Sequence, residues 1–341
     1  MTTTLLKRTI AAGALAAGLA TAAQPALSEH FDDGLVSTYY KAFKGKKVAF
    51  VPISMGFDFT QAWMAAVQRD AQRLGYDVTI RDSNWNVDAG AQALEQLIEE
   101  KPDILIFQNN DMNAYAKLVS RAMAKGINVI QMNLKTPVNS DAFIGPDWYQ
   151  VGVDLIGETA KLCGKGTSGK IGILTGPATS PPNMIGRAGE DDTLAKHPEL
   201  KVVATQAADW DASKAHAVSS TILKQHPDVC ALVGFWDNED IGAAAAVREA
   251  GLTGKVHVVT SGGGNVESGC KNIENGSFSS YVKLDGRDEA HQLATVIQNL
   301  LQVKPKPGSA PYGIYTENAI LTKDTLRPSS CWTVDQIKAG D

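Results

Sequence analysis

Several aromatic residues of this sequence stand next to carboxylate or amide side chains, a combination suited to holding a polyhydroxylated molecule. Two short segments carry it, Phe57-Asp58-Phe59 and Trp236-Asp237-Asn238, and Trp210 lies between two aspartates. Aromatic faces stack on the C–H faces of sugar rings, while carboxylate and amide groups form directional hydrogen bonds with hydroxyl groups. These residue types predict a binding site for a sugar or a polyol.

Three asparagines add further candidates for such a site. Asn110, Asn133 and Asn183 each follow a predicted strand or lie in the loop after one. Helices also favour asparagine and aspartate at their N-terminal caps, so a capping role stays open as the alternative for each of these residues. The positions that fit a cap best are Asp111, Asp211 and Asn238.

The sequence contains no motif typical of an enzyme, a metal site or a nucleotide site. Residues 164–170 match the GxxxxGK opening of a phosphate-binding loop, but no Ser or Thr follows and the segment precedes a predicted strand. The six histidines form no HExxH motif, and no GxSxG segment is present. A glycosidase needs two acidic groups in its cleft, and Asp58 and Asp237 are the candidates for that alternative. We expect a binding protein without catalytic activity, cofactor or metal.

These residues fall within a regular alternation of strands and helices. Short runs rich in valine and isoleucine predict buried parallel strands, and helical periodicity predicts the segments between them. The alternation runs over residues 47–145 and begins again after residue 150, so we predict two doubly wound α/β lobes with parallel sheets. In such sheets ligands bind beyond the carboxyl ends of the strands. Trp63 fits the buried face of a helix over residues 60–74, whereas Trp85 has no predicted role.

The N-terminus has the pattern of a secretory signal peptide. Lys7 and Arg8 give it a positive start, an apolar run over residues 9–20 follows, and small residues at 20–22 and 26–28 fit cleavage sites. The run is shorter than the roughly 20 residues that a spanning helix needs; an uncleaved anchor is the alternative. We therefore assign residues 1–28 to a signal peptide and expect an exported protein.

The charge of the chain argues against nucleic acid as a partner. The formal net charge is −5 at pH 7, and no basic stretch stands out after the signal peptide. Proteins that bind nucleic acid usually carry a basic patch, so we expect no such partner.

The four cysteines allow disulfide bonds in an exported protein. Four cysteines permit three full pairings, which a sequence does not distinguish, and the absence of a CxxC pair makes a zinc site improbable. Cys163 and Cys230 stand in apolar contexts, so we expect buried thiols there. We favour a bridge between Cys270 and Cys331.

Four segments of the chain resemble the ribose-binding-protein family of periplasmic sugar-binding proteins. They are KKVAFVPISMGFDF, GINVIQMN, ADWDASKA and DNEDIGAAAAVREAG, and the resemblance extends over residues 46–325. It implies the type I periplasmic binding fold, in which two lobes joined by three crossover strands close on a ligand. It also implies a periplasmic monomer that binds a sugar or polyol and delivers it to the membrane permease of an ABC transporter. A sensory receptor component with the same fold is the alternative.

The resemblance also places the lobe boundaries. The crossings fall near residues 147–148, 284–286 and 312–315. The N-terminal lobe then comprises residues 46–147 and 286–314, and the C-terminal lobe comprises residues 148–285 and 315–341. All four cysteines lie in the second lobe, which permits the bridge between Cys270 and Cys331.

The aromatic residues match ligand-binding positions of the family. Phe57 and Phe59 match the aromatic region after the family's first strand, and Trp210 matches a stacking phenylalanine. The family's asparagine after a later strand falls on Trp236 or on Asn238. The resemblance therefore implies an aromatic clamp with rings from both lobes.

The charged positions of the family are changed here. Asn133 stands where the family has an Asp-Arg pair, Asn183 replaces an arginine, and Gly262 replaces a carboxylate. The family's hinge-side glutamine falls within the segment Lys283-Leu284-Asp285. With the clamp kept and these charges missing, we expect a tetritol, a pentitol, a cyclitol or an unusual monosaccharide. Arg187, one turn from Asn183, is a substitute donor, with a surface ion pair as the alternative.

Overall fold

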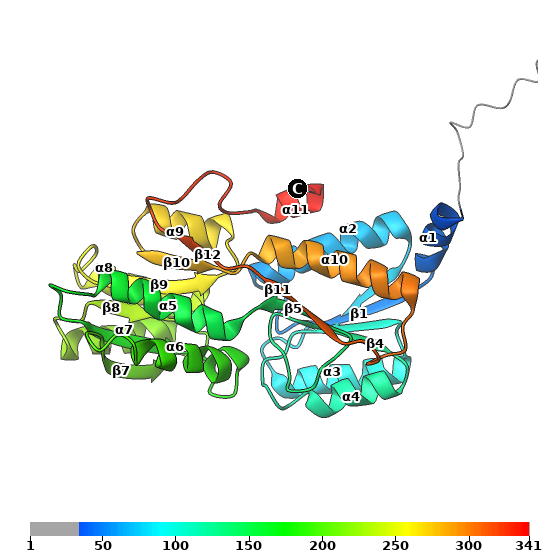
Figure 1. Cartoon of the computed structure of the whole chain (residues 1–341), viewed down its shortest axis with the longest axis horizontal. Coiled ribbons are helices and arrows are strands. Elements are labelled where there is room, and N and C mark those ends of the chain that lie inside the picture. Colours follow the sequence, from blue (N-terminus) through cyan, green and yellow to red (C-terminus); the bar gives the residue numbers. More distant parts are fainter. Residues whose placement is uncertain (1–33, 341) are drawn as a thin grey trace, which may run out of the picture.

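The computed structural model describes residues 34–340, which form two α/β lobes side by side (Figure 1). The predicted signal peptide, residues 1–28, lies outside the described residues. Each lobe is built on a six-stranded sheet, and every strand pair is parallel except the pair of β10 (Ser280–Lys283) with β12 (Ala319–Leu321). The prediction of two doubly wound lobes is confirmed.

The sheet of the first lobe has the strand order β11-β5-β4-β3-β1-β2. Its strands are β1 (Lys47–Val51), β2 (Asp77–Ile80), β3 (Ile104–Phe107), β4 (Asn128–Met132), β5 (Ala142–Pro146) and β11 (Tyr312–Thr316). Its helices are α1 (Leu35–Phe43), α2 (Asp58–Leu74), α3 (Val87–Glu100), α4 (Ala116–Ala124) and α10 (Gly286–Val303).

The sheet of the second lobe has the equivalent order β12-β10-β9-β8-β6-β7. Its further strands are β6 (Lys170–Thr175), β7 (Lys201–Ala207), β8 (Ala231–Val233) and β9 (His257–Gly262). Its helices are α5 (Trp148–Leu162), α6 (Arg187–Leu194), α7 (Ala212–Gln225), α8 (Asp237–Glu249) and α9 (Lys271–Glu274), with π-helical turns η1 (Pro182–Gly186) and η2 (Val266–Cys270).

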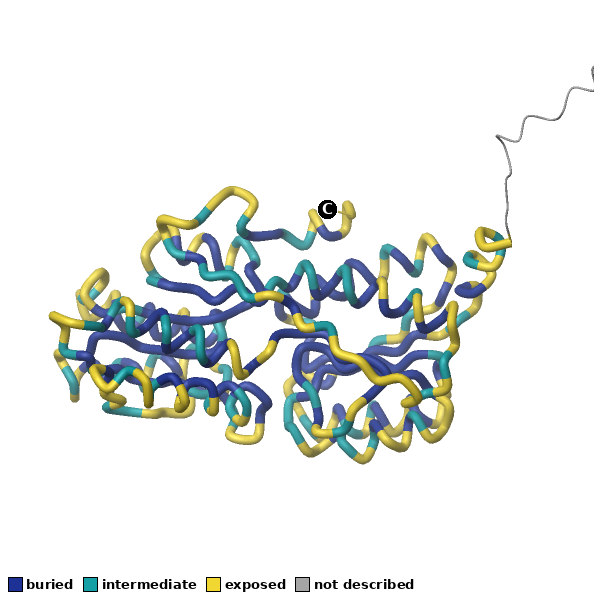
Figure 2. The backbone as a smooth tube through the Cα atoms, viewed as in Figure 1, coloured by how far each residue is buried: buried dark blue, intermediate teal, exposed yellow. Residues whose placement is uncertain are grey.

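The central strands are buried on both faces, as parallel sheets covered by helices require. Every residue of β3, β4 and β8 is buried, whereas β2 and β7, at corresponding edges of the two sheets, are largely exposed or half-buried. Figure 2 shows the buried backbone concentrated in the two sheets, with exposed residues on the outer helices and loops. Trp63 is fully buried on α2, as predicted.

The chain passes between the lobes at three places near those expected. It leaves the first lobe after β5 and returns between β10 and α10. The third passage lies a few residues later than expected, because β11 pairs with β5 as far as Thr316 before β12 joins the second sheet.

The C-terminal segment makes a further passage that the sequence did not indicate. We expected residues 315–341 to lie in the second lobe, but helix α11 (Val334–Ala339) packs against α2 of the first lobe. The side chain of Ile337 is fully buried there, and Arg69 Nη1 donates a hydrogen bond to the Ile337 carbonyl at 2.8 Å. Burial of this apolar side chain stabilises the contact of the short helix with the first lobe.

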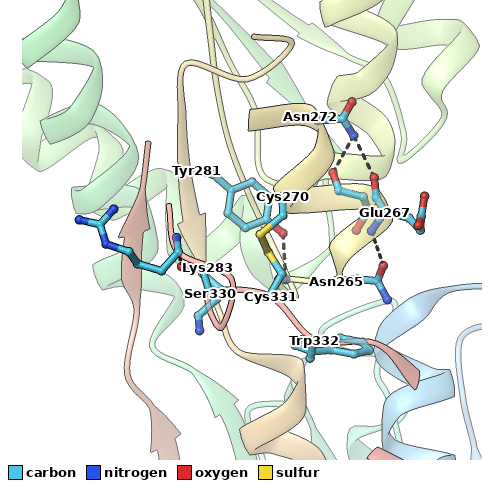
Figure 3. Close-up of a disulfide and its surroundings, with 12 residues drawn as sticks. Asn265, Glu267, Cys270, Asn272, Tyr281, Lys283, Ser330, Cys331 and Trp332 are labelled. Atoms are coloured by element: carbon cyan, nitrogen blue, oxygen red, sulfur yellow. Dashed lines mark hydrogen bonds between the residues drawn. A yellow bond between two sulfur atoms is a disulfide. The ribbon is translucent and has the colours of Figure 1, made fainter. Parts of the chain in front are cut away.

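Two disulfides tie the second lobe together. The predicted bridge between Cys270 and Cys331 is present and holds the C-terminal segment to η2 (Figure 3). The expectation of buried thiols at Cys163 and Cys230 is wrong, because these residues form the second bridge. The fold brings the end of α5 and the start of β8 together, and the two Cα atoms lie 5.8 Å apart, within the reach of a disulfide.

Candidate functional site

A cavity lies between the lobes, where the carboxyl ends of the strands of both sheets meet. It contains about 450 Å³ of space, part of it open to solvent, which is within the range of small-molecule sites. Gln108 and Asn133 are its only lining residues with an amide side chain, and none is charged. The cavity is lined by Ile53, Phe57, Phe59, Trp85, Gln108, Asn133, Leu134, Trp148, Pro182, Trp210, Phe235, Trp236 and Leu284.

A wider and more polar space adjoins this cavity, and we call it the mouth. It shares four aromatic residues with the cavity: Phe57, Trp85, Trp210 and Trp236. Its other lining residues come from both lobes and from the C-terminal segment, namely Ser54, Gly56, Asp58, Gln61, Asn238, Asn265, Glu267, Ser268, Thr333 and Val334. The mouth therefore brings aromatic rings and carboxylates to one place.

The four shared aromatic rings form one cluster that joins the lobes. The ring centroids of Phe57 and Trp236 are 5.8 Å apart, and those of Trp85 and Trp236 are 5.6 Å apart. Trp210 lies 6.2 Å from Trp236 in an edge-to-face arrangement. Aromatic pairs attract each other at these separations. Because Phe57 and Trp85 belong to the first lobe, these contacts stabilise the closed arrangement of the lobes.

Trp85 and Trp210 are presented by the same kind of turn. Both have a φ of 64°, in the left-handed region, and each follows another left-handed residue, Asn84 or Asp209. Each is followed by a residue that caps the next helix: Asn86 caps α3 and Asp211 caps α7. Left-handed backbone is costly for a bulky side chain, so this conformation has to be held by surrounding contacts.

The contacts that hold Trp210 come from the second lobe. A carboxyl oxygen of Glu239 accepts a hydrogen bond from the backbone N–H of Trp210 at 2.5 Å. The ring of Trp210 lies so close to Gly176 that a Cβ at that position would overlap it. Burial and the charge of Asp240 raise the pKa of Glu239 to about 9, which favours the protonated carboxyl group at neutral pH.

Asp58 contacts the other lobe at the mouth. Its Oδ2 accepts a hydrogen bond from the Ser268 hydroxyl of η2 at 3.0 Å, and its Oδ1 accepts one from the Phe59 backbone N–H at 2.9 Å. Burial raises its pKa above the ordinary value, partly offset by these hydrogen bonds. This interaction gives the closed lobes a polar link next to the aromatic cluster.

Asp237 lies behind the mouth rather than in its wall. Its side chain is buried, one oxygen accepts a hydrogen bond from the Tyr281 hydroxyl at 2.8 Å, and the other has no hydrogen-bond partner among the described residues. Burial and the nearby charge of Asp58 raise the pKa of Asp237 to about 8, against the opposing effect of the Tyr281 and Ser268 hydroxyls. Two carboxyl groups from different lobes therefore lie close together, with Asp237 buried and Asp58 half-buried.

Asn133 forms part of a buried network at the floor of the cavity. Its Nδ2 donates to one oxygen of Glu289 at 2.9 Å, and Trp63 Nε1 donates to the other at 3.0 Å. Burial raises the pKa of Glu289 well above its ordinary value. The network thus uses the amide of Asn133. The buried Oε1 of Gln108, in the cavity wall, has no hydrogen-bond partner among residues 34–340 and is a free acceptor.

The structure brings some of the predicted site residues together and leaves others apart. Phe57, Phe59, Asn133, Trp210 and Trp236 line the cavity, and Asp58 and Asn238 line the mouth. Asn238 is not the cap of α8, since Trp236 occupies that position. The predicted residues that line neither space are Asn110, Asn183, Asp237, Lys283 and Asp285.

The residues that line neither space mostly have other partners. Asn183 donates its amide to the carbonyls of Gly176 and Pro177, which closes its own loop. Lys283 pairs with Asp285 at 2.8 Å. Arg187, the predicted substitute donor, pairs with the exposed Asp191, as in the surface-pair alternative, and also with the buried Glu190 of its own helix.

Trp85 is the main lining residue for which no role was predicted. Its surroundings, Asn84-Trp85-Asn86, match Asp209-Trp210-Asp211 in placing a tryptophan between two short polar residues after the second strand of a lobe. This repeated pattern in the sequence could have indicated that Trp85 lines the site as Trp210 does. The other residues of the cavity wall that are outside the predicted site set are Ile53, Gln108, Leu134, Trp148, Pro182, Phe235 and Leu284.

The described residues contain no metal cluster and no phosphate-binding loop. No group of three or more metal-ligating side chains occurs within residues 34–340. In the same part of the chain, no helix has the length and apolar character of a membrane span. The GxxxxGK segment leads into β6, and its Lys170 pairs with Asp228 at 2.8 Å, so it is not folded as a phosphate-binding loop.

Comparison with known sequences identifies relatives over most of the chain. A family model described as a periplasmic binding protein domain matches residues 48–305. The D-ribose/D-allose-binding protein of Pseudomonas aeruginosa is 33% identical over 49% of this chain and 53% of that protein, so the match spans about half of its length. The D-allose-binding periplasmic protein of Escherichia coli is 27% identical over 72% of this chain and 82% of that protein. The xylitol-binding protein of Mycolicibacterium smegmatis is 26% identical over 80% of this chain and 84% of that protein.

Solved structures show the same fold. An ABC transporter solute-binding protein from Burkholderia graminis, in complex with D-arabinose, superimposes with a TM-score of 0.75 at 22% identity, covering 84% of this chain and 98% of that chain. One from Actinobacillus succinogenes with bound D-allose gives a TM-score of 0.71 at 22% identity over 82% and 98%. At this identity the likeness establishes the type I periplasmic binding fold.

Proposed function

The chain belongs to the periplasmic binding protein domain family, and we propose that it is the solute-binding component of an ABC importer for a sugar or polyol. One observation carries the proposal: the cavity is lined by residues of both lobes, and rings of both lobes meet at its mouth. A ligand in this position contacts both lobes only when they are closed. Its binding therefore favours the closed state.

The ligand we propose is a small polyol or an unusual monosaccharide, that is, a tetritol, a pentitol, a cyclitol or a modified sugar. The walls of the cavity carry many rings and only two amide side chains. Each buried hydroxyl group of a ligand needs a hydrogen-bond partner. Because the cavity wall offers few hydrogen-bond partners, it favours a ligand that directs few hydroxyl groups at the wall.

The residues we propose as ligand contacts are those that line the cavity or its mouth. The rings of Phe57, Phe59, Trp210 and Trp236 provide stacking surfaces, and Trp85 is an addition to the predicted set. Polar contacts come from Gln108 in the cavity and from Asp58 and Asn238 in the mouth.

We further propose that the protein acts as a monomer in the periplasm and delivers its ligand to a membrane permease. The support for the periplasm is the predicted signal peptide and the named periplasmic relative. We propose binding without turnover, since the rings and amides of the cavity are suited to holding a ligand.

The test is a ligand panel with the purified protein. The melting temperature is measured with erythritol, xylitol, myo-inositol, D-ribose, D-allose and D-apiose, followed by calorimetric titration of each compound that raises it. A ligand at 100 times its dissociation constant stabilises the folded protein by about 2.7 kcal/mol, which gives a shift of several degrees. The proposal fails if no compound shifts the melting temperature. Chemical change of a bound compound during incubation would instead indicate an enzyme.

A further inference from the structure

Two acidic side chains at the mouth have no basic partner among residues 34–340: Asp58 in its wall and Asp237 behind it. Asp58 and Asp237 take part in no ion pair within the described residues. Glu267, the other acidic residue of the mouth, already pairs with Lys271 at 2.6 Å. No lysine or arginine lines either the cavity or the mouth. Among the described residues, the protein therefore supplies no positive charge to either acidic group.

Two basic residues that are close to the site in sequence pair with other carboxylates. Lys283 pairs with Asp285 at 2.8 Å, and Arg187 pairs with Asp191 at 3.0 Å and with Glu190. Closing the lobes thus places Asp58 of α2 near Asp237 of α8 without bringing a cation to either. Removing an unpaired carboxylate from water is unfavourable, and the raised pKa of each residue reflects this cost.

The aromatic rings of the mouth are suited to the same kind of ligand group. Phe57, Trp85, Trp210 and Trp236 face a common space, and Asp58 is part of its wall. The faces of tryptophan and phenylalanine rings are electron-rich and attract ammonium groups, and the attraction grows when the cation is shielded from water. A cluster of three tryptophans beside an unpaired carboxylate therefore favours a cation over a neutral group.

We propose that the physiological ligand carries an ammonium group in addition to its hydroxyl groups, and that this group lies among the aromatic rings of the mouth with Asp58 as its counter-ion. The inference rests on the proposed function and narrows its ligand class to amino polyols and amino sugars. The hydroxyl groups occupy the apolar cavity, where Gln108 Oε1 has no hydrogen-bond partner in the part of the chain that the structure describes. The ammonium supplies the positive charge that Asp58 and Asp237 lack.

The test compares matched pairs of compounds by calorimetric titration at pH 7. The pairs are glycerol and 2-amino-1,3-propanediol, sorbitol and 1-amino-1-deoxysorbitol, and glucose and glucosamine. We expect the amine to bind at least tenfold more tightly than the alcohol in the best-fitting pair. Its affinity should also rise between pH 6 and pH 7.5, because the ammonium displaces a proton from the two carboxyl groups. The affinity of the neutral partner should not rise over this range.

A matched pair of variants separates the role of Asp58 from a general charge effect. Asp58→Asn keeps an acceptor for Ser268 and should reduce the amine-to-alcohol affinity ratio at least fivefold. Glu274→Gln removes the same charge from an exposed position on α9 and should leave the ratio unchanged. If Asp58→Asn does not fold, the pH dependence of amine affinity in the unmodified protein tests the inference: an affinity that does not rise between pH 6 and pH 7.5 overturns it.

The outcomes distinguish this inference from the proposed function. Alcohols that bind as tightly as their amines would overturn the inference and leave a sugar or polyol binding protein in place. An unchanged affinity ratio in a folded Asp58→Asn variant would also overturn it. If neither these pairs nor the polyol panel bind, both proposals fail together.

Discussion

Trp85 and Trp210 occupy equivalent positions in the two lobes and have the same backbone conformation, with φ at 64° in each. Each follows the second strand of its lobe and precedes a helix whose cap is the next residue, Asn86 or Asp211. Their rings meet Trp236 from opposite lobes, at 5.6 Å and 6.2 Å between ring centroids. Trp236 is thus the point at which the two lobes share one aromatic cluster.

The first prediction is that both equivalent tryptophans are needed for binding. Trp85→Ala and Trp210→Ala should each cost about 2 kcal/mol of binding free energy, or roughly a thirtyfold rise in the dissociation constant, because each removes one aromatic wall. Titration with the best ligand of the panel measures the change. Tyr40→Ala, which removes an exposed ring of α1, is the control. Wild-type affinity in Trp85→Ala would refute the equivalent role of that residue.

The second prediction concerns Glu239, which positions Trp210. Glu239→Ala removes the acceptor for the Trp210 N–H, so we expect at least tenfold weaker ligand binding. Glu239→Gln should bind almost normally at pH 7, because the pKa of about 9 makes the native group a neutral carboxyl that an amide replaces well. A purely destabilising role would weaken binding in both variants in proportion to their loss of stability, which denaturant titration measures.

The fold could be predicted because its signals are local. Each buried strand is a short apolar run and each helix has its own periodicity, so the order of elements and the two lobes followed from the sequence. Phe57 and Trp236 could be placed at the cavity because they lie only a few residues beyond a recognisable strand. Trp85 follows β2, an edge strand in which every residue is exposed or half-buried, and only comparison with the Trp210 turn reveals its role.

Other features depend on which elements become neighbours in space. The amide of Asn183 is directed at its own loop, and no periodicity in the sequence reports that. The pairing of Cys163 with Cys230 requires the end of α5 to lie beside β8. The lobe contacted by Ile337 depends on the path of the whole C-terminal segment. The disulfide and the position of Ile337 depend on contacts between residues far apart in the sequence. Residue type and spacing were therefore insufficient to predict them.

The third prediction is that the protein loses stability as the pH rises from about 5 to 7. Burial raises the pKa of Glu190 and of Asp237 to about 8, that of Glu239 to about 9 and that of Asp240 to about 7. In the unfolded chain these groups lose their protons near pH 4. Between pH 5 and 7 the folded state therefore binds more protons than the unfolded state, and a rise in pH favours unfolding.

The size of this effect follows from the number of protons retained. A group that stays fully protonated in the folded state lowers the free energy of unfolding by about 1.4 kcal/mol per pH unit, and a partly titrated group lowers it by less. Urea denaturation at pH 5, 6 and 7 measures the sum. Asp240→Asn, which removes one titrating group, should give a shallower slope than the unmodified protein. A flat or rising free energy of unfolding between pH 5 and 7 would contradict the prediction.

The fourth prediction separates the two disulfides. The double variant Cys163→Ala/Cys230→Ala opens a loop of 67 residues and should lose about 2 to 4 kcal/mol of stability. Its ligand affinity should stay near normal, because neither cysteine lines the cavity or mouth. Cys270→Ala/Cys331→Ala should also weaken binding, since η2 carries Ser268, the partner of Asp58. Equal effects of both double variants on affinity would contradict this distinction.

The last prediction concerns the C-terminal helix, which links the lobes on the side of the mouth. The disulfide fixes Cys331 to the second lobe, while Ile337 is buried against α2 of the first. Thr333 and Val334, between these anchors, line the mouth itself. Because this link is made when the lobes are closed, we expect it to contribute to the stability of the closed state.

Ile337→Asp places a charge in the contact with α2 and should release α11. We expect faster hydrogen exchange over residues 333–340, a larger radius of gyration with ligand at a fixed subsaturating concentration, and severalfold weaker ligand binding. Lys338→Ala, an exposed change on the same helix, is the control and should alter none of these. If exchange increases while affinity and radius stay unchanged, α11 is only a docked terminus. A coupled change in all three would show that the C-terminal segment helps to hold the lobes together around the ligand.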